Sequence, residues 1–306
     1  MLYWPGKSDT NQERSAMEIR PVFYDNFICL AGRCRHSCCR GWEIDVDEVS
    51  LQRYRDFAGP LGEELRASLE EKDGTWSFRL TGDDDCPFLR RDGLCRLILE
   101  LGEDSLCDIC ALHPRFFQDI AGHELAGVGL SCEASAALLL DLPGELLFLN
   151  ESNERLTLSD VLSLLGQRPA PGGLHFSPRV DGAYYRAIFR RYGQCEAIDQ
   201  AWTRDLAALA ADPEGAARRA EEYTARYDRD AFERLFTYIL YRQLEFLEPL
   251  GLPALLEYAG EAADFIFLWS AVTGDLPECL RRWSAQMEYS EENTAFLLKG
   301  RPGEAY

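Results

Sequence analysis

Residues 32–42 read GRCRHSCCRGW, residues 83–97 read DDDCPFLRRDGLCRL, and residues 105–116 read SLCDICALHPRF. These stretches hold seven of the eleven cysteines of the chain, and with Cys29 and Cys132 nine of the eleven lie from Cys29 to Cys132. Proline, glycine and charged turn residues divide the region into short pieces, a pattern typical of ligand-bearing loops. The sequence therefore predicts an irregular, cysteine-rich, metal-binding region with little β structure.

Eight of these cysteines are the predicted metal ligands. The strongest local signal is the C-x2-C pair of Cys107 and Cys110, because two thiolates at this spacing can chelate one metal from a tight turn. Adjacent cysteines such as Cys38 and Cys39 rarely serve one tetrahedral ion equally well. Eight thiolates fit two four-thiolate sites, or one four-cysteine cluster with structural or redox neighbours. The predicted ligands are Cys34, Cys38, Cys39, Cys86, Cys95, Cys107, Cys110 and Cys132. The predicted group is an iron–sulfur cluster, with zinc as the alternative.

The other cysteines and the histidines carry weaker signals. Cys29, Cys195 and Cys279 each stand alone in an apolar or amphipathic context, and we expect them to be small buried hydrophobic residues. His36 and His113 lie beside the cysteine clusters and could complete a coordination sphere. For His113, an equally good interpretation is a hydrogen-bonded residue that holds a turn.

Composition limits the class of protein. A chain of 306 residues with 46% hydrophobic content can form one or two cores. The formal net charge of −20 and the absence of a basic stripe argue against a nucleic-acid partner. The acidity serves solubility, or it attracts a lysine-bearing protein. No signal-peptide core or membrane-length apolar run is found, so we expect a cytoplasmic protein without a membrane partner. There, reduced cysteines are more naturally metal ligands or redox groups than disulfides.

The remaining pattern predicts a mainly α fold. Near the start we expect helices from Asp47 to residue 57 and over 61–71, then a strand over 76–80 and, after the cysteine-rich loops, a helix from residue 132. Beyond residue 181 the apolar spacing predicts an α-helical bundle. The predicted division is an unpatterned extension over 1–16, a cysteine-rich metal-binding domain over 17–140, a connecting segment over 141–180, and an α-helical domain over 181–306.

Five blocks of the cysteine-rich region together resemble a known family, the flagellin lysine-N-methylases, and the wider group of cysteine-rich zinc- or iron-chelating proteins. The blocks are CRHSCCRGW at 34–42, CPFL at 86–89, GLCRL at 93–97, LGEDSLCDICALHPRF at 101–116 and GLSCEA at 129–134. The resemblance implies transfer of a methyl group from S-adenosylmethionine to lysines of a protein substrate, flagellin in the flagellated members, with an iron–sulfur cluster of the 4Fe-4S type.

Two features leave the chemistry of such a transfer unassigned. The C-x3-C-x2-C signature of radical S-adenosylmethionine enzymes is not met, because Cys38 is followed at once by Cys39. No catalytic base and no S-adenosylmethionine site can be named. Three arginines flank the cysteines of residues 34–39 and could lower the thiolate pKa values or hold the carboxylate of S-adenosylmethionine. They are Arg33, Arg35 and Arg40. Asp108 and the acidic run at 83–85 could recognise an ammonium group, or could simply be solvated.

Two other classes of function stay open. One is a non-catalytic metal-binding protein, either an iron–sulfur electron carrier or a zinc-stabilised interaction module. The other is a thiol redox sensor, in which Cys38 and Cys39, or Cys107 and Cys110, cycle between dithiol and disulfide.

Overall fold

The computed structural model describes residues 17–168 and 173–299, so the predicted extension over 1–16 lies outside the described residues. The chain forms two compact units, each described by itself below. The thiol unit comprises residues 28–116 and 132–134. The sheet–helix unit comprises the described residues of 17–27, 117–131 and 135–299.

This division differs from the predicted one, in which a cysteine-rich domain ran over 17–140. Residues 17–27 group with the sheet–helix unit because strand β1 (Glu18–Pro21) pairs with strands from later parts of the chain. Residues 117–131 do so because they carry most of strands β4 (Arg115–Ile120) and β5 (His123–Val128). The thiol unit is therefore discontinuous in sequence: residues 117–131 belong to the other unit, and Cys132–Ala134 belong to the thiol unit again.

Short elements build the thiol unit. Its α-helices are α1 (Glu48–Asp56), α2 (Gly59–Ser68), α3 (Arg96–Leu101) and α4 (Asp108–Leu112), and its strands are β2 (Leu69–Lys72) and β3 (Thr75–Phe78). Single 3₁₀ turns lie at Ala31–Arg33 and Glu103–Ser105. Helix α1 begins after Asp47, whose carboxylate accepts the Ser50 N–H at 2.8 Å, and this is a standard N-cap.

The predicted helix over 61–71 is too long at its C-terminal end. Helix α2 ends at Ser68, and residues 69–72 form a strand instead. Strands β2 and β3 pair antiparallel, with Leu69 opposite Phe78 and Lys72 opposite Thr75. The two turn residues, Asp73 and Gly74, both have positive φ, as a tight primed hairpin turn requires. The Asp-Gly turn therefore decides the structure of residues 69–72, which form a strand although the spacing of the apolar residues predicted a helix.

A small mixed sheet organises the other unit. Its strand order is β4-β5-β1-β6-β7, with β6 at Phe148–Leu149 and β7 at Arg155–Leu156. Strand β1 is parallel to β5, with Ile19 opposite Leu125, and antiparallel to β6. The sheet was not predicted, although its short strands agree with the expectation of little β structure. Strands of two to six residues leave little periodic signal to read, and β1 pairs with β5 and β6 across long sequence separations.

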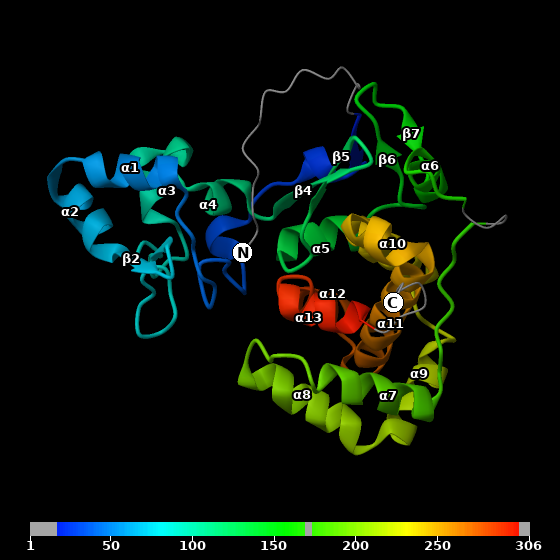
Figure 1. The fold of residues 1–306 in the computed structure, drawn as a ribbon. Coiled ribbons are helices and arrows are strands. Elements are labelled where there is room, and N and C mark those ends of the chain that lie inside the picture. Colours follow the sequence, from blue (N-terminus) through cyan, green and yellow to red (C-terminus); the bar gives the residue numbers. More distant parts are fainter. Residues whose placement is uncertain (1–16, 169–172, 300–306) are drawn as a thin grey trace. The chain divides into compact units, whose positions relative to one another are not determined.

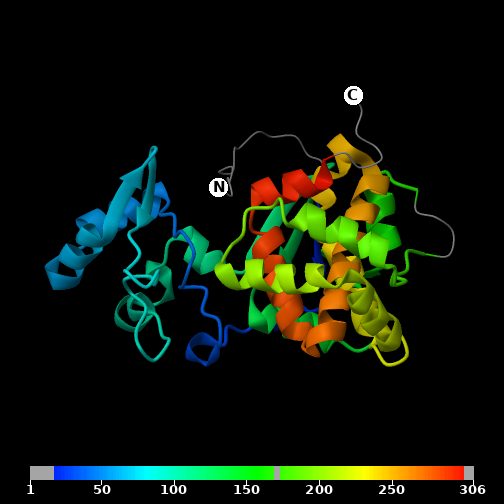
Figure 2. The ribbon, with the colours of Figure 1, turned by 90° about the horizontal axis from the view of Figure 1, so that it is seen from below.

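Helices make up the rest of this unit, and the mainly α fold class is confirmed. They are α5 (Glu133–Leu140), α6 (Leu158–Leu164), α7 (Gly182–Tyr192), α8 (Gln200–Ala211), α9 (Pro213–Tyr223), α10 (Arg229–Arg242), α11 (Leu247–Thr273), α12 (Leu276–Met287) and α13 (Glu291–Leu298). Helix α11 contacts α9, α10, α12 and α13 (Figures 1 and 2). Its residues from Leu255 to Ser270 are buried almost throughout, as expected for the central helix of a bundle.

Buried polar side chains of α10 fix the helices to the sheet. The Tyr238 hydroxyl accepts the Val128 N–H and donates to the Val128 carbonyl, both at 2.7 Å. The Tyr241 hydroxyl lies 2.8 Å from the Ile19 carbonyl and 2.9 Å from that of Ala126. Arg234 donates to the Leu139 and Leu140 carbonyls, which satisfies the C-terminal end of α5. These bonds set the position of α10 across strands β1 and β5.

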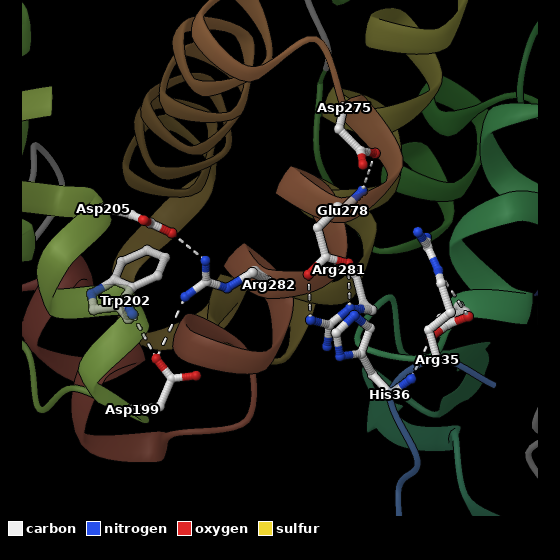
Figure 3. Close-up of polar contacts among 10 residues, drawn as sticks. Arg35, His36, Asp199, Trp202, Asp205, Asp275, Glu278, Arg281 and Arg282 are labelled. Atoms are coloured by element: carbon white, nitrogen blue, oxygen red, sulfur yellow. Dashed lines mark hydrogen bonds and ion pairs between the residues drawn. The ribbon is translucent and has the colours of Figure 1, made fainter. Parts of the chain in front are cut away.

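A second polar connection joins α8 to α12. Arg282 of α12 makes ion pairs with Asp199 and Asp205, and Asp199 also caps α8 by accepting the Trp202 N–H (Figure 3). The adjacent Arg281 pairs with Glu278 within α12 itself (Figure 3). Among the helices of residues 17–168 and 173–299, none combines the length and apolar character needed to cross a membrane.

Candidate metal centre

All eight predicted ligands lie in the thiol unit, and Cys29 lies there with them. None of the cysteines forms a disulfide. The chain leaves the thiol unit at residue 117 and returns for Cys132–Ala134 alone, which brings the last predicted ligand back to the others. The nine thiols fall into two groups with different surroundings.

The first group, here called the inner thiols, belongs to the apolar core of the thiol unit. Cys86 is 7% exposed and Cys107 is 1% exposed, and three half-buried cysteines pack against the same core. That core also contains Leu51, Tyr54 and Phe88. The inner thiols are Cys39, Cys86, Cys95, Cys107 and Cys110.

Backbone contacts hold the inner thiols in place. The Cys86 N–H donates to the Cys39 carbonyl at 2.8 Å, and this bond joins the cysteine stretch at 32–42 to the one at 83–97. Cys95 pairs with Leu89 through an isolated β-bridge and stands at the N-terminus of α3. Gly32 lies against the loop between Cys86 and Cys95, because a Cβ at this position would be 2.5 Å from the Asp92 carbonyl oxygen. Segments that are far apart in sequence are thus held around one core.

The C-x2-C pair lies at the start of α4. Cys107 is the N-cap residue, and the Cys110 N–H donates to the Cys107 carbonyl at 3.0 Å. Asp47 supports this turn by accepting the Asp108 N–H at 3.0 Å, while its other oxygen caps α1. The expected turn geometry for two neighbouring thiols is therefore present, and the backbone of Asp108 takes part in holding it.

Hydrogen bonding and burial set the protonation of the inner thiols. A hydrogen bond from Cys110 lowers the pKa of Cys107, and the same bond raises the pKa of Cys110. Burial raises the pKa of Cys86 to about 12, and the charges of Cys39, Cys95 and Cys107 add to the shift. The inner thiols share one apolar core. Several thiolates in this core would repel each other unless a cation balanced their charge.

The second group, here called the outer thiols, lies near the surface. Cys29 and Cys38 are exposed, whereas Cys34 and Cys132 are half-buried. Burial raises the pKa of Cys34 to about 11, together with the charges of Glu133, Cys132 and Cys29. A hydrogen bond to Cys39 raises the pKa of Cys38, and the charges of Cys29 and Cys132 raise this pKa further. The outer thiols are Cys29, Cys34, Cys38 and Cys132.

Cys29 corrects one prediction. It was expected to be a buried hydrophobic residue, but its side chain is exposed and its sulfur accepts the Ala31 N–H at 3.3 Å. Its position five residues before Cys34, in a stretch dense in cysteine, was the signal that could have identified it. Cys279 is buried in α12 as expected, and Cys195 is half-buried beside Tyr192 and Trp202.

Other predicted site residues have structural partners. Arg40 makes an ion pair of 3.0 Å with Asp85, the last residue of the acidic run. Arg35 lies 3.9 Å from Glu133, and the His36 backbone N–H donates to Glu133 at 2.6 Å (Figure 3). Burial lowers the pKa of His113, which ends α4, to about 4. A neutral imidazole is the form that both proposed roles of His113 need.

Within residues 17–168 and 173–299, no set of three or more His, Cys, Asp and Glu side chains is already arranged to hold a metal ion. Metal affinity and local folding are coupled in cysteine-rich domains, so the thiols need not be arranged around the ion before it binds. Five inner thiols outnumber the four that an iron–sulfur cluster or a structural zinc requires, so the core holds enough thiols for either group.

Comparison with known proteins places the chain near one class. It is 27% identical over 129 residues to a lysine-N-methylase of Salmonella choleraesuis. The aligned stretch covers 40% of this chain and 32% of that protein. The lysine-N-methylase of Salmonella typhimurium matches similarly, at 26% identity. A flagellar biosynthetic protein FliU of Salmonella muenchen is also 26% identical, with 76% of its length covered. No protein-family model and no solved structure matches.

The resemblance to the flagellin lysine-N-methylase family is thereby confirmed. The match spans about a third of the length of the two lysine-N-methylases.

Proposed function

We propose that this protein is a protein-lysine N-methyltransferase that uses S-adenosylmethionine and a cysteine-ligated iron–sulfur cluster. The reaction replaces one proton of a lysine ε-amine with the methyl group of S-adenosylmethionine, leaving S-adenosylhomocysteine. The observation that carries the proposal is the similarity to lysine-N-methylases, together with five thiols, two buried and three half-buried, in the apolar core of the cysteine-rich unit.

The inner thiols would hold the cluster. Four of Cys39, Cys86, Cys95, Cys107 and Cys110 would ligate it, and the apolar core around them would keep water away. When bound, an iron–sulfur cluster supplies one-electron chemistry at a potential set by its burial and hydrogen bonds. The protein's own contribution would be to bring thiols from three segments of the chain into one apolar core.

The proposed substrate is a protein with surface lysines, with flagellin as the first candidate. The relatives' names, lysine-N-methylase and flagellar biosynthetic protein, support this choice. The net charge of −20 favours association with a lysine-bearing surface, because opposite charges steer the encounter.

The test is a methyl-transfer assay under exclusion of oxygen. The full chain is incubated with flagellin and S-adenosylmethionine carrying an isotopic methyl group, and label on lysine is read by mass spectrometry. We expect labelled lysines with the unaltered protein, strong loss of label for Cys107→Ser, and retained label for the control Cys195→Ser in the other unit. Label that is absent for flagellin and for a mixture of lysine-rich proteins would reject the methyltransferase.

One observation favours a second candidate, a zinc-stabilised interaction module. Cys86 and Cys107 are part of the apolar core, so a metal held there would act as a structural support of the thiol unit. A colourless protein that contains zinc and is indifferent to S-adenosylmethionine would favour this candidate.

A further inference from the structure

An extended segment of the sheet–helix unit is held by side chains of the surrounding helices. Residues 174–180, here called the strap, belong to no helix or strand and lead into α7 (Figure 1). The Phe176 N–H donates to the Glu233 carboxylate at 3.0 Å, and the Arg179 N–H donates to the Asp264 carboxylate at 2.9 Å. In peptide recognition, main-chain hydrogen bonds of this kind supply affinity, and contacts of the side chains supply specificity.

Phe176 anchors the strap. The centroid of its ring lies 5.7 Å from that of Phe232 in a stacked arrangement, and 6.3 Å from those of Phe236 and Phe267. Phe176 is buried, although the residues on either side of it are exposed. A single aromatic side chain of an exposed segment thus packs among aromatic rings of α10 and α11, as the anchor residue of a bound peptide does.

Arg179 occupies a cation site. Its guanidinium lies over the Tyr184 ring, 4.8 Å from the centroid, and its Nε lies 3.8 Å from an Asp264 carboxylate oxygen. The Tyr184 hydroxyl donates to the same oxygen at 2.8 Å, and the Tyr185 hydroxyl donates to the Arg179 carbonyl at 2.5 Å. The Asp264 side chain is 2% exposed, whereas that of Arg179 is 55% exposed. A buried carboxylate beside an aromatic ring favours a cation, and here the strap supplies it.

These contacts set the chemistry of any other occupant. A ligand without a cation would leave the Asp264 carboxylate buried and unpaired, which is costly. The ligand must also offer main-chain N–H groups to Glu233 and Asp264, and an aromatic ring in place of that of Phe176. Residues 176–179 read F-S-P-R, so the aromatic residue stands three positions before the basic one. Pro178 disfavours a helix for the residue before it, which keeps the strap extended.

We propose that the helical surface holding residues 176–179 is a peptide-binding site, that the strap fills it as a displaceable internal ligand, and that its partner is an extended segment of another protein with an aromatic residue three positions before a lysine or arginine. The tethered strap is present at an effective concentration of about millimolar, so a free peptide competes poorly until the strap is weakened. Docking here requires no methyl transfer, so either can fail while the other stands.

Titration of a labelled peptide tests the site. A fluorescent peptide with the sequence of residues 174–180 is titrated into the full chain, and binding is followed by anisotropy. We expect Arg179→Ala to bind the peptide at least tenfold more tightly than the unaltered protein, because the weakened strap competes less. Adding Asp264→Asn to this variant should remove the gain. The control Ser177→Ala, at an exposed position of the strap, should bind the peptide as the unaltered protein does.

Hydrogen exchange of the unaltered chain tests displacement without any substitution. The amides of Phe176 and Arg179 should exchange through local opening, at least a hundredfold faster than those of residues 262–268 in α11 and with little dependence on low urea concentrations. Exchange with the same rate and urea dependence as those α11 amides overturns the proposal, since the strap would then open only with the whole fold. Equal peptide affinity of Arg179→Ala and the unaltered protein, or no binding to either, also overturns it.

Discussion

The backbone N–H of His36 donates a 2.6 Å hydrogen bond to the carboxylate of Glu133, a residue 97 positions further along the chain. The contact exists because the chain returns to the thiol unit at Cys132–Ala134 after forming strands of the sheet. Since Glu133 follows Cys132 directly, the bond holds Cys132 near the cysteines of residues 34–39.

Replacing Glu133 by alanine should make the backbone of residues 35–39 less protected from solvent. The variant loses the 2.6 Å hydrogen bond from the His36 N–H to the Glu133 carboxylate, and we expect amide hydrogen exchange over residues 35–39 to accelerate about tenfold. Glu133→Gln keeps an acceptor oxygen and should show a smaller effect. Glu151→Ala is the matched control, because Glu151 accepts the Glu18 N–H in the other unit. Equal exchange over 35–39 in all variants would contradict this role.

The predictability of the fold followed the length of its elements. The helical bundle beyond residue 181 was predicted from its apolar spacing, and α5 from the run after Cys132. The sheet was missed because β6 and β7 have two residues each and β1 pairs with a strand about a hundred residues away. Periodicity in a short window carries no information on such pairing.

The location of the candidate site was predictable, but the grouping of its thiols was not. The cysteine spacing identified eight thiols, and the structure gathers all of them in one unit. Sequence could not assign Cys38 and Cys39 to different surroundings, because that depends on which residue meets the core. Cys29 was wrongly expected to be buried, although its position five residues before Cys34 was a signal against that expectation.

Gly32→Ala should destabilise the thiol unit. The added Cβ would lie 2.5 Å from the Asp92 carbonyl oxygen and 3.3 Å from Leu94 Cδ2, so backbone must move. We expect a loss of about 1–3 kcal/mol in the free energy of unfolding, measured by urea titration. Gly82→Ala is the control, because a Cβ there meets nothing within 4 Å. If both variants unfold at the same urea concentration, the close approach does not constrain this loop.

A buried carboxyl in the bundle should give a pH-dependent stability. Burial raises the pKa of Asp264 to about 6, although the Arg179 N–H and the Tyr184 hydroxyl donate to it. The unfolded value is near 3.9, so the folded state binds the proton more tightly. This contribution is fully present below about pH 4 and is lost as the pH rises through about 6; it amounts to at most about 3 kcal/mol.

Asp264→Asn should remove this dependence. The difference in free energy of unfolding, variant minus unaltered protein, should rise between about pH 4 and 6.5 in urea titrations. Asp160→Asn is the control, since its hydrogen bond with Thr157 lowers the pKa of Asp160 and moves its effect below about pH 4. Parallel curves for Asp264→Asn and the unaltered protein would show that Asp264 stays charged in the fold.

The central claim is that the inner thiols hold an iron–sulfur cluster. Its most direct measurement is the iron and sulfide content and visible absorption of the full chain purified without oxygen, compared among the unaltered protein, Cys107→Ser and Cys195→Ser. The account predicts a brown protein with about four irons and four sulfides per chain, retained in Cys195→Ser and lost in Cys107→Ser. Stoichiometric zinc without iron, or a brown cluster fully retained in Cys107→Ser and in a further Cys86→Ser variant, would contradict it.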